Sequence, residues 1–108
     1  MGLIYSDFAP LFKALSDETR LKIIDMLSCG QLCACEILEP LSISQSTLSY
    51  HMKQLVDSGL VIAQKDGAWM RYSINAEKSE ELIHFTRMIT TSKTDCICHM
   101  SSIKEVIL

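Results

Sequence analysis

The chain has 108 residues, of which 48% are hydrophobic, and its formal net charge is −3. This length allows one domain with a modest core, and the apolar fraction excludes a disordered chain. Because the net charge is negative, nucleic-acid binding cannot be argued from a basic overall charge. Unbroken apolar runs such as residues 60–63 are far too short to cross a bilayer, and the first basic residue is Lys13, so we expect a cytoplasmic protein without a secretory leader.

Two amphipathic helices are predicted in the N-terminal part. In the first, apolar residues recur at helical spacing and form one stripe, made of Ile4, Phe8, Leu11, Phe12 and Leu15. Ser16, followed by Asp17 and Glu18, is expected to cap the second helix, which should end near Gly30. The residues that this second helix should turn inward are Leu21, Ile24 and Leu27.

Two further helices are predicted in the middle of the chain. Residues 32–38 form a short helix candidate that stops before Pro40. Ser44 can cap a longer helix that runs to about Ser58, with Gly59 as its stop. The inner face of that helix carries Leu48, Met52, Leu55 and Val56. Its outer face is polar with little charge, and carries Ser46, Tyr50, Lys53, Gln54 and Asp57.

A β-hairpin and a last helix are predicted to follow. Residues 60–65 and 69–74 favour strands and are separated by Asp66-Gly67, a strong two-residue hairpin signal. Residues 77–91 return to the helical pattern. The expected fold is therefore mainly α with a small β-hairpin, in the order helix, helix, helix, helix, hairpin, helix. Two helices joined by a tight turn and followed by a hairpin make a winged helix-turn-helix, whose second helix enters the major groove of DNA.

The five cysteines are clustered rather than spread along the chain. Cys33 and Cys35 form one C-x-C pair, Cys96 and Cys98 form another, and Cys29 stands apart. Disulfides are rare in a reducing compartment, so such clusters indicate metal binding or redox sensing. We expect residues 1–92 to form the DNA-binding domain and residues 93–108 to form a cysteine-bearing tail.

Three ordered segments resemble the ArsR/SmtB metalloregulators. They are ALSDETRLKII at residues 14–24, QLCACEIL at residues 31–38, and SQSTLSYHMKQL at residues 44–55. The first is similar to the opening motif of that family, the second to its metal box and the third to its recognition helix. The resemblance implies a homodimeric repressor of double-stranded operator DNA, with the terminal helices forming the dimer interface.

The metal box narrows the inducer that the resemblance implies. A C-x-C pair in the third helix is similar to the arsenite and antimonite sensors and to the cadmium/lead sensors. The cadmium/lead type also uses cysteines in an N-terminal extension, and this chain has none before Cys29. The zinc and nickel type uses Asp and His pairs on the last helix, which here offers only His84. The resemblance therefore implies arsenite or antimonite, bound by the thiolates of Cys33 and Cys35.

The third ligand of such a site stays open. Many sensors of this type take a sulfur three residues after the second cysteine, where this chain has Leu38. The candidates are Cys29, Cys96 and Cys98, or a water or chloride. In an extended tail Cys96 and Cys98 would face the same side and could chelate together with His99, or their thiols could be incidental.

The geometry of a helix leads to a hypothesis about how ligand binding releases DNA. Residues two apart on a regular helix point about 200° apart. Cys33 and Cys35 therefore cannot converge while residues 32–38 keep an ideal helix, and ligand binding should distort that helix. Because the helix positions the recognition helix, ligand and DNA would favour different states of one element.

Candidate DNA contacts lie on the recognition helix and the hairpin, and are Gln45, Ser46, Thr47, Ser49, Tyr50, His51, Lys53, Gln54, Lys65 and Arg71. His51 falls between the inner and outer faces, so a DNA contact and a packing role are both open. Residues 44–75 contain three basic side chains and only two acidic ones, Asp57 and Asp66, so the segment is barely positive. Binding should still depend strongly on salt.

The sequence is also compatible with two other functions. A thiol redox sensor would join Cys33 or Cys35 to Cys96 or Cys98 in a disulfide, and a winged helix can also serve protein binding alone. No glycine-rich phosphate loop or nucleophile elbow occurs in the sequence, so we expect no enzyme.

Overall fold

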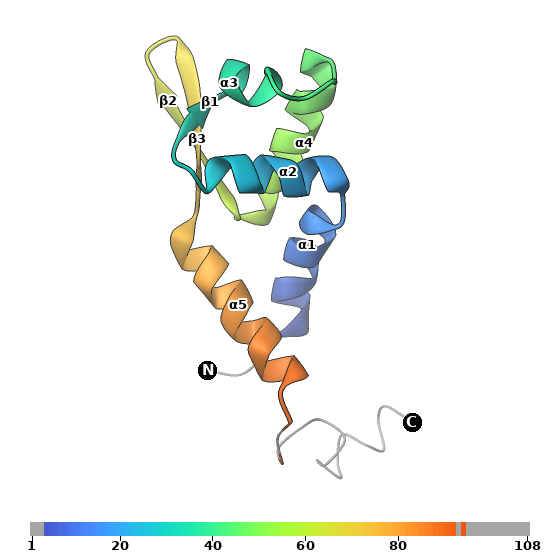
Figure 1. Ribbon diagram of the computed structural model, residues 1–108. Coiled ribbons are helices and arrows are strands. Elements are labelled where there is room, and N and C mark those ends of the chain that lie inside the picture. The colour runs from blue at the N-terminus through green and yellow to red at the C-terminus, as the bar shows by residue number, and fades with distance from the viewer. Residues whose placement is uncertain (1–3, 93, 95–108) are drawn as a thin grey trace.

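The computed structural model describes residues 4–92 and residue 94. Its helices are α1 (Tyr5–Leu15), α2 (Glu18–Leu27), α3 (Ala34–Leu38), α4 (Gln45–Ser58) and α5 (Ala76–Thr90), and its strands are β1 (Leu32–Cys33), β2 (Val61–Asp66) and β3 (Trp69–Ile74). Helices α1 and α5 meet at one end of the molecule, while α2, α3, α4 and the sheet form the other (Figure 1). The mainly helical winged helix-turn-helix expected from the sequence is confirmed.

The sheet has one more strand than the sequence predicted. The three antiparallel strands lie in the order β1-β3-β2. In β1, Leu32 pairs with Tyr72 and Cys33 pairs with Arg71. The prediction of a helix over residues 32–38 is therefore wrong at its start: Cys33 has extended backbone angles (φ −88°, ψ 166°), and the helix begins at Ala34. Pairing with β3 provides this segment with its hydrogen bonds, so it does not need a helix to satisfy them.

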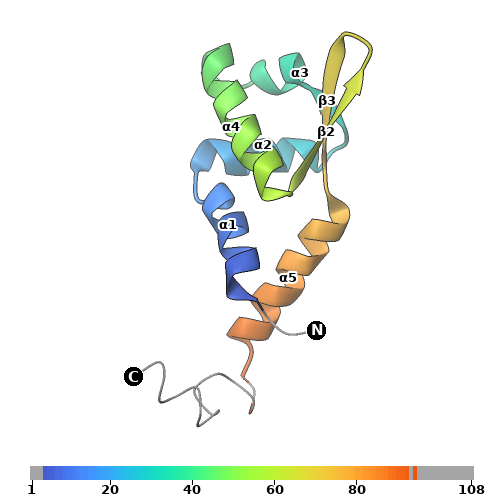
Figure 2. The ribbon, with the colours of Figure 1, turned by 180° about the vertical axis from the view of Figure 1, so that it is seen from behind.

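The hairpin of β2 and β3 forms the wing, which projects at the top of Figure 1 and is seen from behind in Figure 2. Asp66 pairs with Trp69, so the two-residue loop is Gly67-Ala68 and not Asp66-Gly67 as predicted. Gly67 has φ +63° and Ala68 has no positive φ. A positive φ at the first central position alone is the pattern of a type II′ turn, which favours glycine there.

The main hydrophobic core lies between the helices and the sheet. Its buried residues are Ala14, Ile23, Leu27, Ile37, Leu48, Met52, Leu55 and Val61. The expectation that Leu21 points inward is wrong, since its side chain is 51% exposed while Ile23 is fully buried. Residues two apart point in nearly opposite directions on a helix, so a stripe through Ile23 and Leu27 leaves Leu21 outside.

Helix caps set the ends of α2 and α4. Asp17, and not Ser16, caps α2: its carboxylate accepts the backbone N–H of Arg20 at 3.1 Å, and this bond holds the pKa of Asp17 below its ordinary value. At α4 the predictions are confirmed, because the hydroxyl of Ser44 accepts the N–H of Thr47 at 3.1 Å and Gly59 ends the helix with φ +90°.

A second cluster joins α1 to α5. Leu11, Leu60 and Leu82 are its buried residues. The rings of Phe8 and Phe85 stack with their centroids 4.1 Å apart. Several large apolar side chains on α1 and α5, and at the residue that precedes α1, stay exposed, and these are Ile4, Tyr5, Phe12, Ile83 and Ile89. None of the helices formed by residues 4–92 combines the length and hydropathy that crossing a membrane requires.

Arg20 ties three helices together. Its Nε donates to the carbonyl of Ala14 at 2.6 Å, and its NH1 lies 2.9 Å from Nδ1 of His51 on α4. A guanidinium only donates, so Nδ1 accepts and neutral His51 carries its hydrogen on Nε2. The carboxylate of Asp17 lies 3.9 Å from the same Nδ1. Through Arg20 the end of α1 and the start of α2 fix the position of α4.

Replacing Arg20 with alanine should lower the free energy of unfolding by about 1–3 kcal/mol, because it leaves the 9%-exposed His51 without its charged donor. Urea unfolding at one fixed protein concentration measures this loss, since association would otherwise change the result. Lys22→Ala is the matched control: its pair with Glu18 is exposed, and its effect should stay within about 0.5 kcal/mol. Equal losses in the two variants would contradict the role given to Arg20.

Candidate thiol site and nucleic-acid interface

The two cysteines of the metal box converge. Their Sγ atoms lie 2.8 Å apart, with Cys33 buried at the end of β1 and Cys35 exposed in the first turn of α3. The hypothesis that convergence requires a distorted helix is wrong. Because Cys33 lies outside the helix in extended backbone, both sulfurs reach one point while α3 stays intact.

A reciprocal cap holds Cys33 in place. The carboxylate of Glu36 accepts the backbone N–H of Cys33 at 2.9 Å, and the Cys33 side chain faces the N–H of Glu36. The bond to the Cys33 N–H holds the pKa of Glu36 below its ordinary value. The hydrogen bond with Cys35 raises the pKa of Cys33 and outweighs the opposite effect of the Glu36 N–H. The site therefore presents one sulfur with a retained proton beside a second, exposed sulfur.

Two adjacent thiols suit a soft centre. Thiolate sulfur prefers soft metals and metalloids, and here two sulfurs are already next to each other on a fixed backbone. Cys29 is exposed in the turn between α2 and β1. Within residues 4–92 and 94, no three or more Cys, His, Asp or Glu side chains gather into a metal-binding group. Cys96, Cys98 and His99 lie outside the described residues.

The outer face of α4 carries most of the candidate DNA contacts. Those that are exposed on it are Gln45, Ser46, Thr47, Ser49, Tyr50 and Lys53, while Gln54 is half-buried. His51 does not join them: it is 9% exposed and bonded to Arg20, so its position favours the packing role. On the wing, Lys65 is exposed and Arg71 is half-buried.

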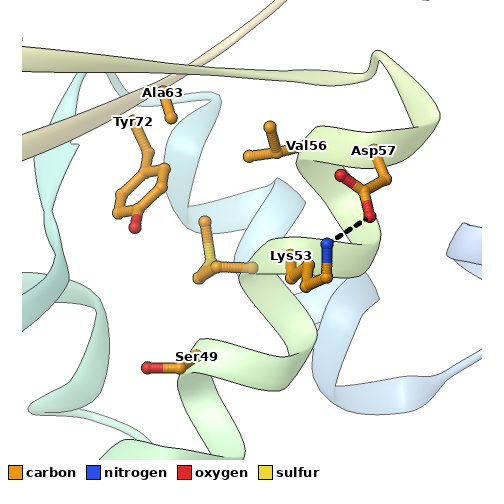
Figure 3. A pocket seen from close by; sticks show the side chains of 7 residues that line it. Ser49, Lys53, Val56, Asp57, Ala63 and Tyr72 are labelled. Carbon is orange, nitrogen blue, oxygen red and sulfur yellow. Dashed lines mark hydrogen bonds and ion pairs between the residues drawn. The ribbon is translucent and has the colours of Figure 1, made fainter.

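Two of the three cations on this surface are held by carboxylates of the same chain. The Nζ of Lys53 lies 3.0 Å from Asp57 one helical turn later, and the Nε of Arg71 lies 3.0 Å from Asp66 on the wing. Figure 3 shows the Lys53–Asp57 pair at the edge of an open hollow between α4 and the wing. The residues that line the hollow are Ser49, Met52, Lys53, Val56, Asp57, Ala63 and Tyr72. Lys65 takes part in no ion pair with any residue that the structure describes.

Sequence reasoning missed two parts of this arrangement. One is β1, which places Cys33 opposite Arg71 and so joins the thiol site to the wing. A strand of two residues has no alternation to detect, so the sequence carried no signal for it. The other is the pairing of the two acids with two of the bases. For Lys53 and Asp57 a signal existed, since oppositely charged residues four apart on a helix are neighbours.

Comparisons with known proteins agree with this architecture. Residues 17–63 match the family described as "Bacterial regulatory protein, arsR family". The chain is 46% identical to the arsenical resistance operon repressor of Staphylococcus aureus, over 87% of this chain and 90% of that protein. It is 38% identical to a cadmium resistance transcriptional regulatory protein CadC homolog from the same organism, over 71% of this chain and 64% of that protein.

A solved structure also matches the fold. It is the homodimeric winged helix-turn-helix DNA-binding domain Mb0332 from Mycobacterium bovis, described as a possible ArsR-family transcriptional regulator. The TM-score is 0.66 and the identity 27%, and the match covers 78% of each chain. With a relative at 46% identity over most of both chains and a matching family model, the protein belongs to the ArsR family of transcriptional regulators.

Proposed function

We propose that this protein is a cytoplasmic, homodimeric repressor that binds operator DNA and releases it when arsenite or antimonite binds Cys33 and Cys35, which derepresses a resistance operon. The observation that carries the proposal is the pair of sulfurs 2.8 Å apart on a segment hydrogen-bonded to the wing. The identity to an arsenical resistance repressor supports the choice of ligand. The alternatives are cadmium or lead as ligand, supported by the cadmium relative, and thiol oxidation.

DNA binding rests on α4 and the wing. The exposed hydroxyls and amides near the N-terminus of α4 can contact phosphates and base edges, and the helix dipole favours a phosphate there. Lys65 and Arg71 on the wing would contact the backbone next to the major groove. The surface has little net charge, so the two copies of α4 and the wing in a dimer provide the number of contacts that one copy lacks.

A second copy of this chain would cover the apolar faces of α1 and α5. The exposed side chains there surround an open groove lined by Phe12, Leu15, Leu82, Ile83, Thr86, Arg87 and Thr90. The homodimeric state of the Mycobacterium bovis domain supports this assignment. A dimer of this kind would set the distance between the two α4 helices and hence the spacing of the operator half-sites.

Arsenite would react with the thiol pair by ligand exchange. Neutral As(OH)3 and two thiols give two As–S bonds and two water molecules, with the thiol protons leaving on the displaced hydroxides. The buried Cys33 and the exposed Cys35 supply the two sulfurs. A third bond would go to Cys29, Cys96 or Cys98, or would remain with a hydroxide.

The coupling to DNA would run through β1. Cys33 is part of β1, and its backbone pairs with Arg71 on the wing strand β3. A ligand held between the two sulfurs would push them farther apart than 2.8 Å, and a movement of Cys33 would then displace β1 against β3. DNA would favour the wing position of the free protein, and the ligand would favour the displaced position. Binding of either one would therefore lower the affinity of the protein for the other.

Serine substitutions test the ligand set. Cys33→Ser and Cys35→Ser should each bind DNA as the wild type does and lose release by arsenite, because one sulfur cannot chelate. A DNA-shift assay with excess reductant measures both properties and removes oxidation as a cause. Cys29→Ser and the double variant Cys96→Ser/Cys98→Ser should still release DNA. The variant that removes the third sulfur should need a higher arsenite concentration for release, and the other variant should behave as the wild type does. Release that survives in Cys33→Ser would refute the proposed site.

The number of protons released on binding distinguishes arsenite from a divalent cation such as cadmium. Cadmium binding to two thiols must release their protons to solution, whereas As(OH)3 passes them to its own leaving hydroxides. The Cys33 pKa is raised, so below it the apparent Kd for cadmium should increase by at least about tenfold for each unit that the pH falls. The apparent Kd for arsenite should stay nearly constant over the same range. Calorimetry in buffers of different ionisation enthalpy counts the protons, and a strong pH dependence for arsenite would contradict the exchange reaction.

A further inference from the structure

The DNA-facing surface carries two intrachain ion pairs whose carboxylates have no evident role in reading DNA. Asp57 holds Lys53 on α4, and Asp66 holds Arg71 on the wing, each at 3.0 Å. Lys53, Asp57 and Asp66 have largely exposed side chains, with relative accessibilities of 71%, 60% and 66%, and the half-buried Arg71 side chain keeps 40%. Because the acids stand next to the cations, each would also stand close to any phosphate that its partner contacts.

A phosphate that takes Lys53 or Arg71 must compete with the carboxylate. When the cation turns to DNA, the carboxylate loses its partner and takes up a cation from solution, which cancels part of the counterion release that drives phosphate binding. Exposed pairs of this kind are weak, so a phosphate can break them at a modest cost. The effect is local, since charges farther away than about 10 Å are screened by salt.

We propose that Asp57 and Asp66 determine the affinity of this protein for DNA by holding two of its three DNA-facing cations in ion pairs that phosphates must break. This inference rests on the proposed DNA-binding function. The acids weaken phosphate contacts, which are the same for every sequence, and leave base contacts from α4 unchanged. They therefore raise the share of the binding free energy that depends on sequence.

The test compares Asp57→Asn and Asp66→Asn with Asp25→Asn. Asp25 is exposed on α2 and belongs to no ion pair among residues 4–92 and 94, so its variant makes the same change in net charge away from the DNA-facing cations. The probes are a fluorescent duplex selected by the wild type from a random-sequence library and an unrelated duplex of equal length. Anisotropy measured over a series of salt concentrations gives Kd and its salt dependence for each.

Asp57→Asn and Asp66→Asn should each lower Kd by between about 2-fold and about 30-fold, since a dimer frees two cations and exposed pairs are worth up to about fivefold each. The slope of log Kd against log salt should steepen by up to about 1.8 for the dimer. The gain should be equal on the unrelated duplex, because phosphates are common to both. Asp25→Asn should change neither the slope nor the affinity by a comparable amount.

The outcomes distinguish the two proposals. If the wild type selects no duplex, the DNA-binding function itself is wrong. If the wild type binds DNA but Asp57→Asn and Asp66→Asn behave as Asp25→Asn does, the ion pairs serve only the helix and the hairpin, and the inference is overturned. A gain confined to the selected duplex also overturns it, since the acids would then act on base contacts.

Discussion

The antiparallel pairing of β1 with β3 is the constraint on which the thiol site depends. It draws Cys33 out of the helix that follows and holds it in extended backbone opposite Arg71. In this position the sulfurs of Cys33 and Cys35 meet while α3 stays regular. The cap from Glu36 then fixes the Cys33 backbone, so the pair is organised before any ligand arrives. A preorganised pair avoids most of the entropic cost of ordering a chelate.

Arg20 provides a second connection, at the middle of α4. It joins the carbonyl that ends α1 to the buried His51 in the middle of α4. Since α1 also packs on α5 through Phe8 and Phe85, the proposed dimer face and the DNA-facing helix belong to one packed unit. The wing is held differently, by contacts with β1, α2, α3 and α4. A change at the cysteines would reach the wing directly, because Cys33 pairs with Arg71 on β3.

Sequence patterns predicted the parts of the fold that depend on local chemistry. Ser44 and Gly59 marked the ends of α4 correctly because a hydroxyl cap and a left-handed glycine act within a few residues. The pairing of Cys33 with Arg71 was missed because it joins residues far apart in the chain and too few of them to form a pattern. For the same reason the sequence placed the cysteines on one helix and derived a strain that the structure does not contain. Among the candidate DNA contacts on α4, the structure buries His51, and its burial depends on a contact with Arg20 from another helix.

The weak charge of the DNA face and the position of Arg71 are connected. The protein has a net charge of −3, and two of its three local cations are already paired, so the proposed complex with DNA would gain less from each phosphate contact than a strongly basic surface would. A coupling free energy of about 1–3 kcal/mol is typical of allosteric proteins. It would be a larger fraction of the total DNA-binding free energy here than in a protein that binds phosphates strongly. Arg71 belongs both to the strand pair with Cys33 and to the ion pair with Asp66. Under the proposed mechanism a ligand on the sulfurs would therefore act on a DNA contact of Arg71 that Asp66 already weakens, and a small displacement of β3 would be enough to remove it.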